Sequence, residues 1–392
     1  MAAGLVCLVA AYVLSQFFRT FLAVMSPVLG AEVGAGPDDL AMASSLWFIA
    51  FAAMQFPVGA ALDRVGPRRT AAVLLAAGGG GGALVFALAT APWHLWLAMV
   101  LIGIGCSPVL MASYFIFARV YPPKMFGALA GLTVGVGSLG VIIGSAPLAW
   151  IIGAIGWRAA LGALAVIALA VAGGIFLLAR DPEPAADARA ETGTFGELFA
   201  IRALWPVAAL MFVAYAPAAM IRGLWAGPYL GEVYGADVAG IGWATLVMSL
   251  AMVAGNLVIG PLDRLVGSRK WSVVGCVSLS ALALGTLAWA PAAGFWTAAV
   301  LLAVHGFFGA TYPAIMAHGR SFLPPHLIGR GVSFINLFSI GGAGVMQFAS
   351  RPVYRALEGG SAEATFRGLF LFFLVPLLAG LAIYLFSRDE RV

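Results

Sequence analysis

The chain has 392 residues, of which 62% are hydrophobic and only 9% are charged, and its mean hydropathy is +1.02. This composition excludes ordinary soluble domains, in which about 25% of the residues are charged. A net charge of +5 would fit nucleic-acid binding, but in so apolar a chain the loop lysines and arginines are expected to set membrane orientation. We therefore predict a membrane protein.

Twelve apolar stretches follow one another along the chain, each long enough to cross a bilayer as a helix of roughly 20 residues. Their predicted limits are 4–29, 40–61, 70–91, 95–118, 126–151, 159–179, 204–228, 239–262, 271–290, 293–319, 328–350 and 367–387. The first stretch is long and contains Arg19, which favours a retained helix over a cleaved signal peptide. The predicted class is an all-α membrane protein with twelve transmembrane helices.

The predicted loops are unequal in basic residues. Those on the side of both termini carry most of the lysines and arginines, whereas the opposite loops carry only Arg158, Arg351, Arg355 and Arg367. Because lysine and arginine accumulate in cytoplasmic loops, both termini are expected in the cytoplasm. The expected location is the cell inner membrane, crossed many times.

One polar segment divides the chain. It runs from Arg180 to about Thr194 and is rich in proline, alanine and acidic residues, a composition typical of flexible linkers. We predict an N-terminal six-helix bundle over residues 1–180, a cytoplasmic linker over 181–203 and a C-terminal six-helix bundle over 204–392.

The two halves resemble each other at an offset of about 200 residues, as in transporters built from parallel repeats. The sequence PVLM at 108–111 is echoed by PAIM at 313–316, and the prolines at 122–123 are echoed by those at 324–325. Chance is a poor explanation for such a series.

A glycine- and arginine-rich loop follows the second predicted helix, and a shifted copy follows the eighth. The defined positions are Gly59, Asp63, Arg64, Gly66, Arg68 and Arg69 in the first copy, and Asp263 and Arg264 in the second. These loops resemble the signature of the major facilitator superfamily. The resemblance covers essentially the whole chain and implies a gradient-driven transporter in which two six-helix bundles alternate access to a central site. It also implies that these loops latch the halves during switching.

Two arginines lie well inside predicted helices, where a charge costs about 3 kcal/mol on insertion scales. They are Arg19 in helix 1 and Arg222 at the corresponding place in helix 7, and Tyr12 and Tyr215 precede them by two helical turns. Gln16 shares the face of helix 1. Because arginine binds carboxylates and phosphates bidentately, we expect the pair to clamp a small anion, an arrangement that resembles organophosphate and organic anion transporters. The alternative is that both arginines snorkel to helix ends.

Other side chains could line the same cavity. The candidates are Trp47, Tyr114, His305, Tyr312 and Asn336. The histidine could titrate near neutral pH, although a hydrogen-bonded core role is the alternative. No Asp or Glu is expected inside a helix, which favours anion exchange or an ion carried with the substrate over a carboxylate proton carrier.

Three alternative cargoes remain open. Met248 and Met252 share a face of helix 8 and, with Met220, resemble the methionine motifs of CcoA-type copper importers, because thioethers bind Cu(I). Such methionines also serve as core filler. A glycine series in helix 5 resembles nitrate and nitrite porters, whose substrate arginines nevertheless lie in helices 2 and 8. Export of amphipathic drugs is the third alternative.

No phosphate loop, metal-ligand cluster or activated nucleophile occurs in the sequence, so we expect neither an enzyme nor a cofactor. The expected partners are a small anionic substrate and membrane lipids, with no nucleic acid, and a monomer would suffice. The sequence leaves substrate identity and transport direction open.

Overall fold

The structure is a computed structural model that describes residues 2–182, 195–324 and 327–389. Within these ranges the chain consists of helices joined by turns, which confirms the all-α prediction. The physical reason is that a long apolar run in a bilayer must satisfy its own backbone hydrogen bonds, and a helix does so.

The helices group into two compact units. The first comprises Met1–Pro184 and Asp237–Trp243, and the second comprises Ala185–Ala236 and Ala244–Val392. The linker expected over 181–203 lies partly outside the described residues, and it contains the short helix α12 (Phe195–Ala200). Its exact limits stay a prediction.

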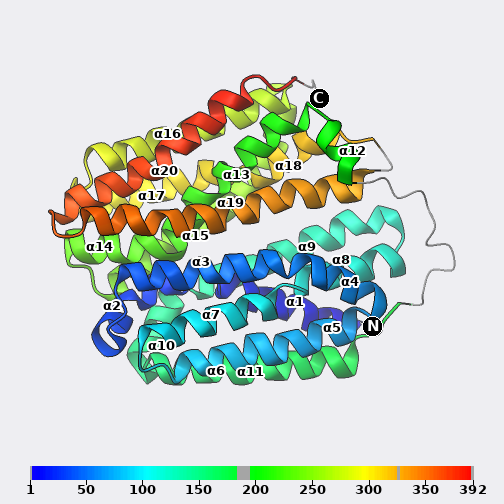
Figure 1. The fold of residues 1–392 in the computed structure, drawn as a ribbon, viewed down its shortest axis with the longest axis horizontal. Coiled ribbons are helices and arrows are strands. Elements are labelled where there is room, and N and C mark those ends of the chain that lie inside the picture. Colours follow the sequence, from blue (N-terminus) through cyan, green and yellow to red (C-terminus); the bar gives the residue numbers. More distant parts are fainter. Residues whose placement is uncertain (1, 183–194, 325–326, 390–392) are drawn as a thin grey trace. The chain divides into compact units, whose positions relative to one another are not determined.

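The helices of the N-terminal half lie in the first unit (Figure 1). They are α1 (Ala2–Phe17), α2 (Leu22–Val33), α3 (Pro37–Ala53), α4 (Gln55–Arg64), α5 (Pro67–Leu74), the π-helix η1 (Leu75–Gly80), α6 (Gly81–Ala87), α7 (Pro92–Cys106), α8 (Val109–Val120), α9 (Pro123–Ile143), α10 (Ala146–Ile155) and α11 (Trp157–Leu178).

The C-terminal half has fewer interruptions than the N-terminal half. Its helices are α13 (Leu204–Met220), the π-helix η2 (Ile221–Trp225), α14 (Ala226–Tyr234), α15 (Val238–Val266), α16 (Arg269–Trp289), α17 (Phe295–Gly309), α18 (Tyr312–Ser321), α19 (Ile328–Leu357) and α20 (Ala362–Tyr384).

Nine helical segments of the described chain are long and apolar enough to cross a membrane, and two bent helix pairs raise this number to eleven. The remaining predicted span, 328–350, falls on α19, whose 30 residues extend over about 45 Å. The spans predicted as continuous over 4–29 and 126–151 are both broken, with bends of 57° and 46°.

The first bend has a local cause. Residues 18–21 form a turn between α1 and α2, in which the Thr20 hydroxyl donates to the Phe17 carbonyl at 3.1 Å. Pro27, inside α2, cannot donate to the Ala23 carbonyl, and Ser26 Oγ occupies that carbonyl instead at 2.9 Å. Hydroxyl groups thus take over backbone bonds that the helix loses, as expected within a membrane.

Each unit contains contacts in which two helix backbones touch, and one in each unit is especially close. A Cβ atom added to Gly140 of α9 would lie 1.9 Å from the Val13 carbonyl oxygen of α1, and one added to Gly342 of α19 would lie 1.9 Å from the Phe212 carbonyl oxygen of α13. Membrane helices associate through such small residues because lipid supplies no hydrophobic driving force between them. Glycine at these two positions sets the spacing of the helices.

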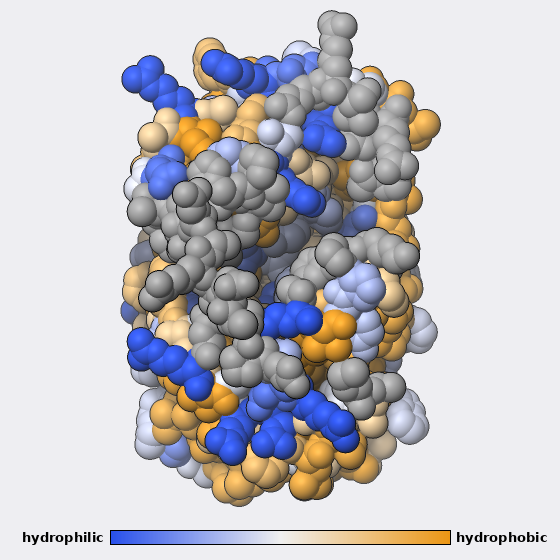
Figure 2. All heavy atoms as spheres, turned by 90° about the vertical axis from the view of Figure 1, so that its right-hand side faces the viewer, coloured by the Kyte–Doolittle hydropathy of each residue, from blue (hydrophilic) through white to orange (hydrophobic). Residues whose placement is uncertain are grey.

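The surface divides by polarity as expected for a membrane protein. Large apolar side chains such as Trp150, Leu177, Leu265 and Trp289 are each at least 76% exposed, which suits contact with lipid rather than water. Figure 2 shows hydrophilic residues spread over the face that it draws, with hydrophobic residues along its right-hand edge and in its lower part.

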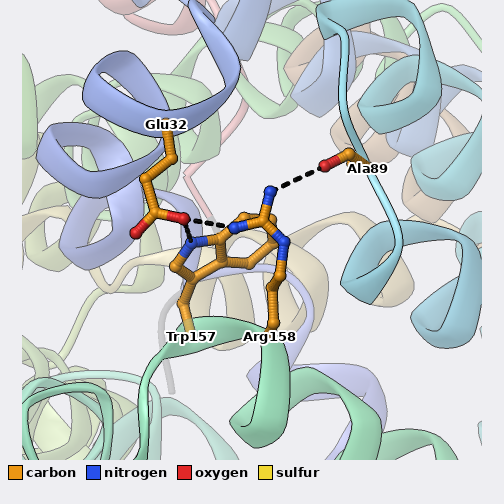
Figure 3. A network of polar contacts seen from close by, with 4 residues as sticks. All are labelled: Glu32, Ala89, Trp157 and Arg158. Carbon is orange, nitrogen blue, oxygen red and sulfur yellow. Dashed lines mark hydrogen bonds and ion pairs between the residues drawn. The ribbon is translucent and has the colours of Figure 1, made fainter.

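A polar network joins three helix ends in the first unit (Figure 3). One Glu32 oxygen, Oε2 in α2, accepts from the Trp157 indole N–H at 2.9 Å and from the Arg158 guanidinium. The other arm of Arg158 donates to the Ala89 carbonyl at 3.1 Å. The network therefore holds the beginning of α11 against the ends of α2 and α6.

Candidate functional site

Arg19 lies in the turn between α1 and α2, beside two aromatic rings. Its guanidinium carbon is 5.0 Å from the ring centroid of Trp47 and 5.0 Å from that of Phe51, both in α3. The two rings stack at a centroid distance of 5.1 Å. Cation–π attraction holds the charge here without neutralising it. Because α1 ends at Phe17, the spacing to Tyr12 no longer places both side chains on one helix face.

Among the described residues, three polar atoms of Arg19, Trp47 and Gln16 are buried without a hydrogen-bond partner. They are Arg19 Nε, Trp47 Nε1 and Gln16 Oε1. Within the part of the chain that the structure describes, no carboxylate pairs with Arg19. Buried polar groups are normally hydrogen-bonded, because leaving them bare costs free energy. A ligand oxygen could accept from the guanidinium and the indole together.

Two further candidates lie close together in the first unit. Tyr12 packs against Gly137 of α9, where an added Cβ atom would come within 2.3 Å of the ring. Its phenol is near enough to Tyr114 of α8 for the two groups to interact electrostatically. The structure thus brings two of the predicted tyrosines together.

Arg222 lies in the π-helical turn η2, between α13 and α14, and is 6% exposed. A π-helix inserts an extra residue into an α-helix and is frequent at functional sites. Arg19, its counterpart in the repeat, also lies where regular helix is interrupted. Sequence analysis missed both interruptions, although Pro27 and Pro217 could have indicated them.

Three candidates of the C-terminal half form one cluster. The ring centroids of Tyr215 (α13) and Tyr312 (α18) are 6.3 Å apart. The Tyr312 hydroxyl donates to Asn336 Oδ1 of α19 at 2.8 Å. The second unit therefore contains a polar aromatic cluster contributed by three helices.

The hydrogen bonds of the His305 side chain through Nδ1 join it to Ser280 and not to that cluster. It is 1% exposed in α17, and its Nδ1 is 2.9 Å from Ser280 Oγ and 3.1 Å from the Ser280 carbonyl oxygen of α16. These contacts are those of a hydrogen-bonded core residue. A role in substrate binding stays a prediction.

The methionines of the copper alternative are buried in the second unit. Met220, Met248 and Met252 are at most 5% exposed. The γ-carbons of Met248 and Met252 lie 3.1 and 2.9 Å from the position of a Cβ added to Gly306 of α17. They fill the space beside a glycine, which is the common role of methionine in helix packing.

The expectation that no carboxylate lies inside a helix is wrong, because the helices extend further than predicted. The acidic residues concerned in the described part of the chain are Glu32, Asp38, Asp39, Asp63, Glu197, Glu232, Asp263 and Glu363. All of them lie within four residues of a helix end. Asp38 and Asp39 occupy the first turn of α3, where the helix dipole favours negative charge.

The predicted signature loops are also shorter than expected. Gly59 and Arg64 belong to α4, and Arg68 and Arg69 to the first turn of α5, which leaves a two-residue turn at 65–66. Gly66 has φ of 94°, a conformation that favours glycine and permits so tight a turn. The side chains of Asp63, Asp263 and Arg264 lie outside the described part of the structure.

Asp181, directly after α11, completes the first signature loop. Its Oδ1 accepts from the backbone N–H of Arg68 at 2.8 Å, and its Oδ2 is 3.7 Å from Arg68 Nε. A Cβ atom on Gly66 would lie 2.7 Å from this carboxylate. Asp181 therefore caps the beginning of α5 from a distant part of the chain.

The second half has an equivalent arrangement. Ser268 Oγ, which caps α16, donates to Asp389 Oδ1 at 2.5 Å. Lys270 Nζ donates to the carbonyls of Leu385 and Ser387 at 2.6 and 2.9 Å. In each half, the segment after the last long helix thus binds the beginning of the third span. Sequence analysis missed Asp181 and Asp389, because both fall in polar tails without a motif.

Comparison with known proteins agrees with this fold. The sequence matches the family model described as Major Facilitator Superfamily over residues 8–227 and 207–392. No curated protein matches the chain.

Several solved structures share the fold across nearly the whole chain. A bacterial homologue of the human lysosomal transporter Spinster, inward-facing and unoccupied, has a TM-score of 0.78 at 17% identity and covers 98% of this chain and 96% of its own. A D-xylose–proton symporter has a TM-score of 0.77 at 14% identity and covers 98% of each chain. A point mutant of the nucleoside transporter NupG has a TM-score of 0.73 at 12% identity and covers 97% of this chain and 99% of its own. At such identities the likeness shows the fold alone.

Proposed function

We propose that this chain, which belongs to the major facilitator superfamily and is a multi-pass membrane transporter rather than an enzyme, carries a small anion. The proposed cargo is a carboxylate or a phosphate ester. The proposed residues for binding the anionic group are Arg19 and Arg222.

The surroundings of Arg19 carry this proposal. Its charge lies against the faces of Trp47 and Phe51, and Arg19 Nε and Trp47 Nε1 are buried donors without a partner. Two N–H donors beside a fixed positive charge suit an oxyanion, since charge-assisted hydrogen bonds are roughly twice as strong as neutral ones. A cationic cargo such as Cu(I) would be repelled from the same place.

Arg222 supports the proposal from the other half. It is buried and lies on a π-helical turn. Such an irregular turn is frequent at functional sites and is consistent with a guanidinium held inside a span. Its position corresponds to that of Arg19 under the internal repeat.

The acidic residues bear on coupling. Those in the described helices lie near helix ends rather than mid-span. We propose anion exchange, or co-transport of an ion with the substrate, in place of proton transfer by a mid-span carboxylate. We also propose insertion in a cell inner membrane as a monomer, with both termini and the 181–203 linker in the cytoplasm, because basic residues concentrate there.

The test is thermal stabilisation of the detergent-purified protein by glycerate, glycerol 3-phosphate, nitrate and Cu(I). A bound anion raises the melting temperature with its concentration. We expect Arg19→Gln and Arg222→Gln each to weaken the response to the stabilising anion at least about tenfold, the size of a lost charge-assisted bond. Arg320→Gln removes an exposed arginine and serves as the charge-matched control.

Two results would contradict the proposal. One is stabilisation by an anion that both arginine variants retain in full. The other is stabilisation by Cu(I) that requires Met248 and Met252, which would favour the copper alternative.

A further inference from the structure

Gln347 of α19 is buried without a hydrogen-bond partner in the described structure. Its exposed fraction is 0%, and both side-chain atoms of its amide, Nε2 and Oε1, lack partners. An unpaired amide is expensive in a protein interior, and native proteins rarely keep one without a function. The question is which ligand group it could bind.

Contacts between α13 and α19 locate this amide along the helices. The Phe212 carbonyl of α13 lies against Gly342 of α19, and further along the Trp225 indole N–H donates to Ser350 Oγ at 3.2 Å. Both residue numbers increase in the same direction, so the two helices run parallel. Gln347 lies between these two contacts, five residues after Gly342 and three before Ser350.

Phe212 and Trp225, the partners of Gly342 and Ser350 on the other helix, are thirteen residues apart. The same fraction of that interval falls about eight residues after Phe212, at Met220. Gln347 is therefore level with the start of η2, the turn that contains Arg222. The anion-binding arginine and the unpaired amide belong to the same layer of the second unit.

The buried stripe of α19 gives the direction of the amide. Ala343, Gln347, Ser350 and Tyr354 follow one another at helical spacing and are at most 3% exposed. Ser350 and Tyr354 of this stripe contact Trp225, through the hydrogen bond above and through rings 5.2 Å apart. Gln347 thus lies on the face of α19 that meets η2.

We propose that Gln347 is a specificity-determining residue that binds a hydroxyl group of the substrate, beside the anionic group bound by Arg222. This inference rests on the proposed function. An amide offers one donor group and one acceptor, and a hydroxyl can pair with both. An anionic group would accept from Nε2 alone and leave Oε1 without a partner. The substrate class is therefore a hydroxylated carboxylate or a phosphate ester of a polyol, rather than nitrate or a simple alkyl acid.

The experiment compares matched probes with and without hydroxyl groups: glycerate against propionate, and glycerol 3-phosphate against propyl phosphate. Apparent affinities come from thermal stabilisation of the full-length protein. The wild type is expected to bind the hydroxylated member of at least one pair about tenfold more tightly, the size of a lost hydrogen bond to a neutral group. Gln347→Leu should reduce this preference to within about twofold, whereas Arg222→Gln should weaken both members of the pair.

Two further variants keep the test sharp. Gln347→Met is apolar and similar in length, and in both Gln347 variants the unliganded protein should melt no lower than the wild type, because an unpaired amide has been removed. Gln55→Leu is the matched control, since the Gln55 amide already bonds the Phe51 carbonyl at 3.0 Å. It should leave the hydroxyl preference unchanged.

The outcomes separate the two levels of inference. If anions stabilise the protein through the arginines but Gln347→Leu keeps the hydroxyl preference, or weakens both probes equally, the role of Gln347 is refuted and the proposed function stands. A lower melting temperature in both unliganded Gln347 variants also refutes it, because the amide then has partners in the protein. If no anion stabilises the wild type, the proposed function fails and this inference fails with it.

Discussion

Replacing Gly140 by alanine tests the close contact of α1 and α9. The added Cβ atom would lie 1.9 Å from the Val13 carbonyl oxygen, and real Cβ contacts essentially never fall below 3.0 Å. The two backbones must therefore separate by about 1.1 Å at this point. A gap of that size forfeits about a quarter to a half of the dispersion energy of the atoms along the contact.

Overpacking of this kind costs about 1–3 kcal/mol, and here no flexible side chain can yield. We expect Gly140→Ala to lower the melting temperature in detergent by about 1–4 °C, by the usual relation between stability and melting temperature. Because unfolding of membrane proteins is often irreversible, variants are compared at one heating rate.

Gly135 provides the matched control on the same helix. Nothing lies within 4 Å of a Cβ atom added there. Alanine at this position should raise the melting temperature slightly, since it gains up to about 1 kcal/mol of helix propensity over glycine. Equal melting temperatures for Gly135→Ala and Gly140→Ala would refute the reasoning, because the two changes differ only in what the new methyl group meets.

Three other expectations follow from the contacts. Glu32→Gln and Arg158→Gln should each lower the melting temperature, and the double variant should lose less than the sum, as a double-mutant cycle would show for groups that share a bond. Asp181→Ala should cost about 1 kcal/mol in thermal stability through loss of the α5 cap, whereas Asp181→Asn should stay near the wild type because asparagine caps equally well. His305→Phe should cost about 1 kcal/mol because it removes the hydrogen bonding between Nδ1 and Ser280, whereas the Ser280 hydroxyl keeps its bond to the carbonyl of residue 305. If the same change abolished anion stabilisation and left the unliganded melting temperature intact, His305 would be a substrate residue instead of a core residue.

The helical class followed from hydropathy because bilayer thickness and backbone hydrogen bonding leave few alternatives to a helix of about 20 apolar residues. The interruptions did not follow. Arg19 was predicted within a regular helix, yet it lies in a turn in which the Thr20 hydroxyl bonds the Phe17 carbonyl, and the Ser26 hydroxyl replaces a backbone donor in the following helix α2. Hydropathy averages over a window and cannot register a change of four residues.

Candidate site residues could be proposed where chemistry alone singles them out. A lone arginine in an apolar run is conspicuous, and so Arg19 and Arg222 could be proposed from the sequence. Gln347 could not, because glutamine occurs at many packed positions and only its lack of partners in three dimensions distinguishes it. Asp181 was hidden for a related reason, since its partner Arg68 is 113 positions away.

Arginines near helix ends make similar contacts in the two halves. Arg158, at the start of α11, donates to the Ala89 carbonyl just after α6, and Arg367, in the second turn of α20, donates to the Ala288 carbonyl near the end of α16 at 3.2 Å. The glutamates near the end of the first span of each half have different partners: Glu32 accepts from Trp157, whereas Glu232 accepts from Tyr354. A bond to a backbone carbonyl does not depend on which side chain stands at the accepting position, because every residue supplies a carbonyl. The last helix of each half is therefore joined to the end of the third span in both halves, although the two arginines do not occupy equivalent positions.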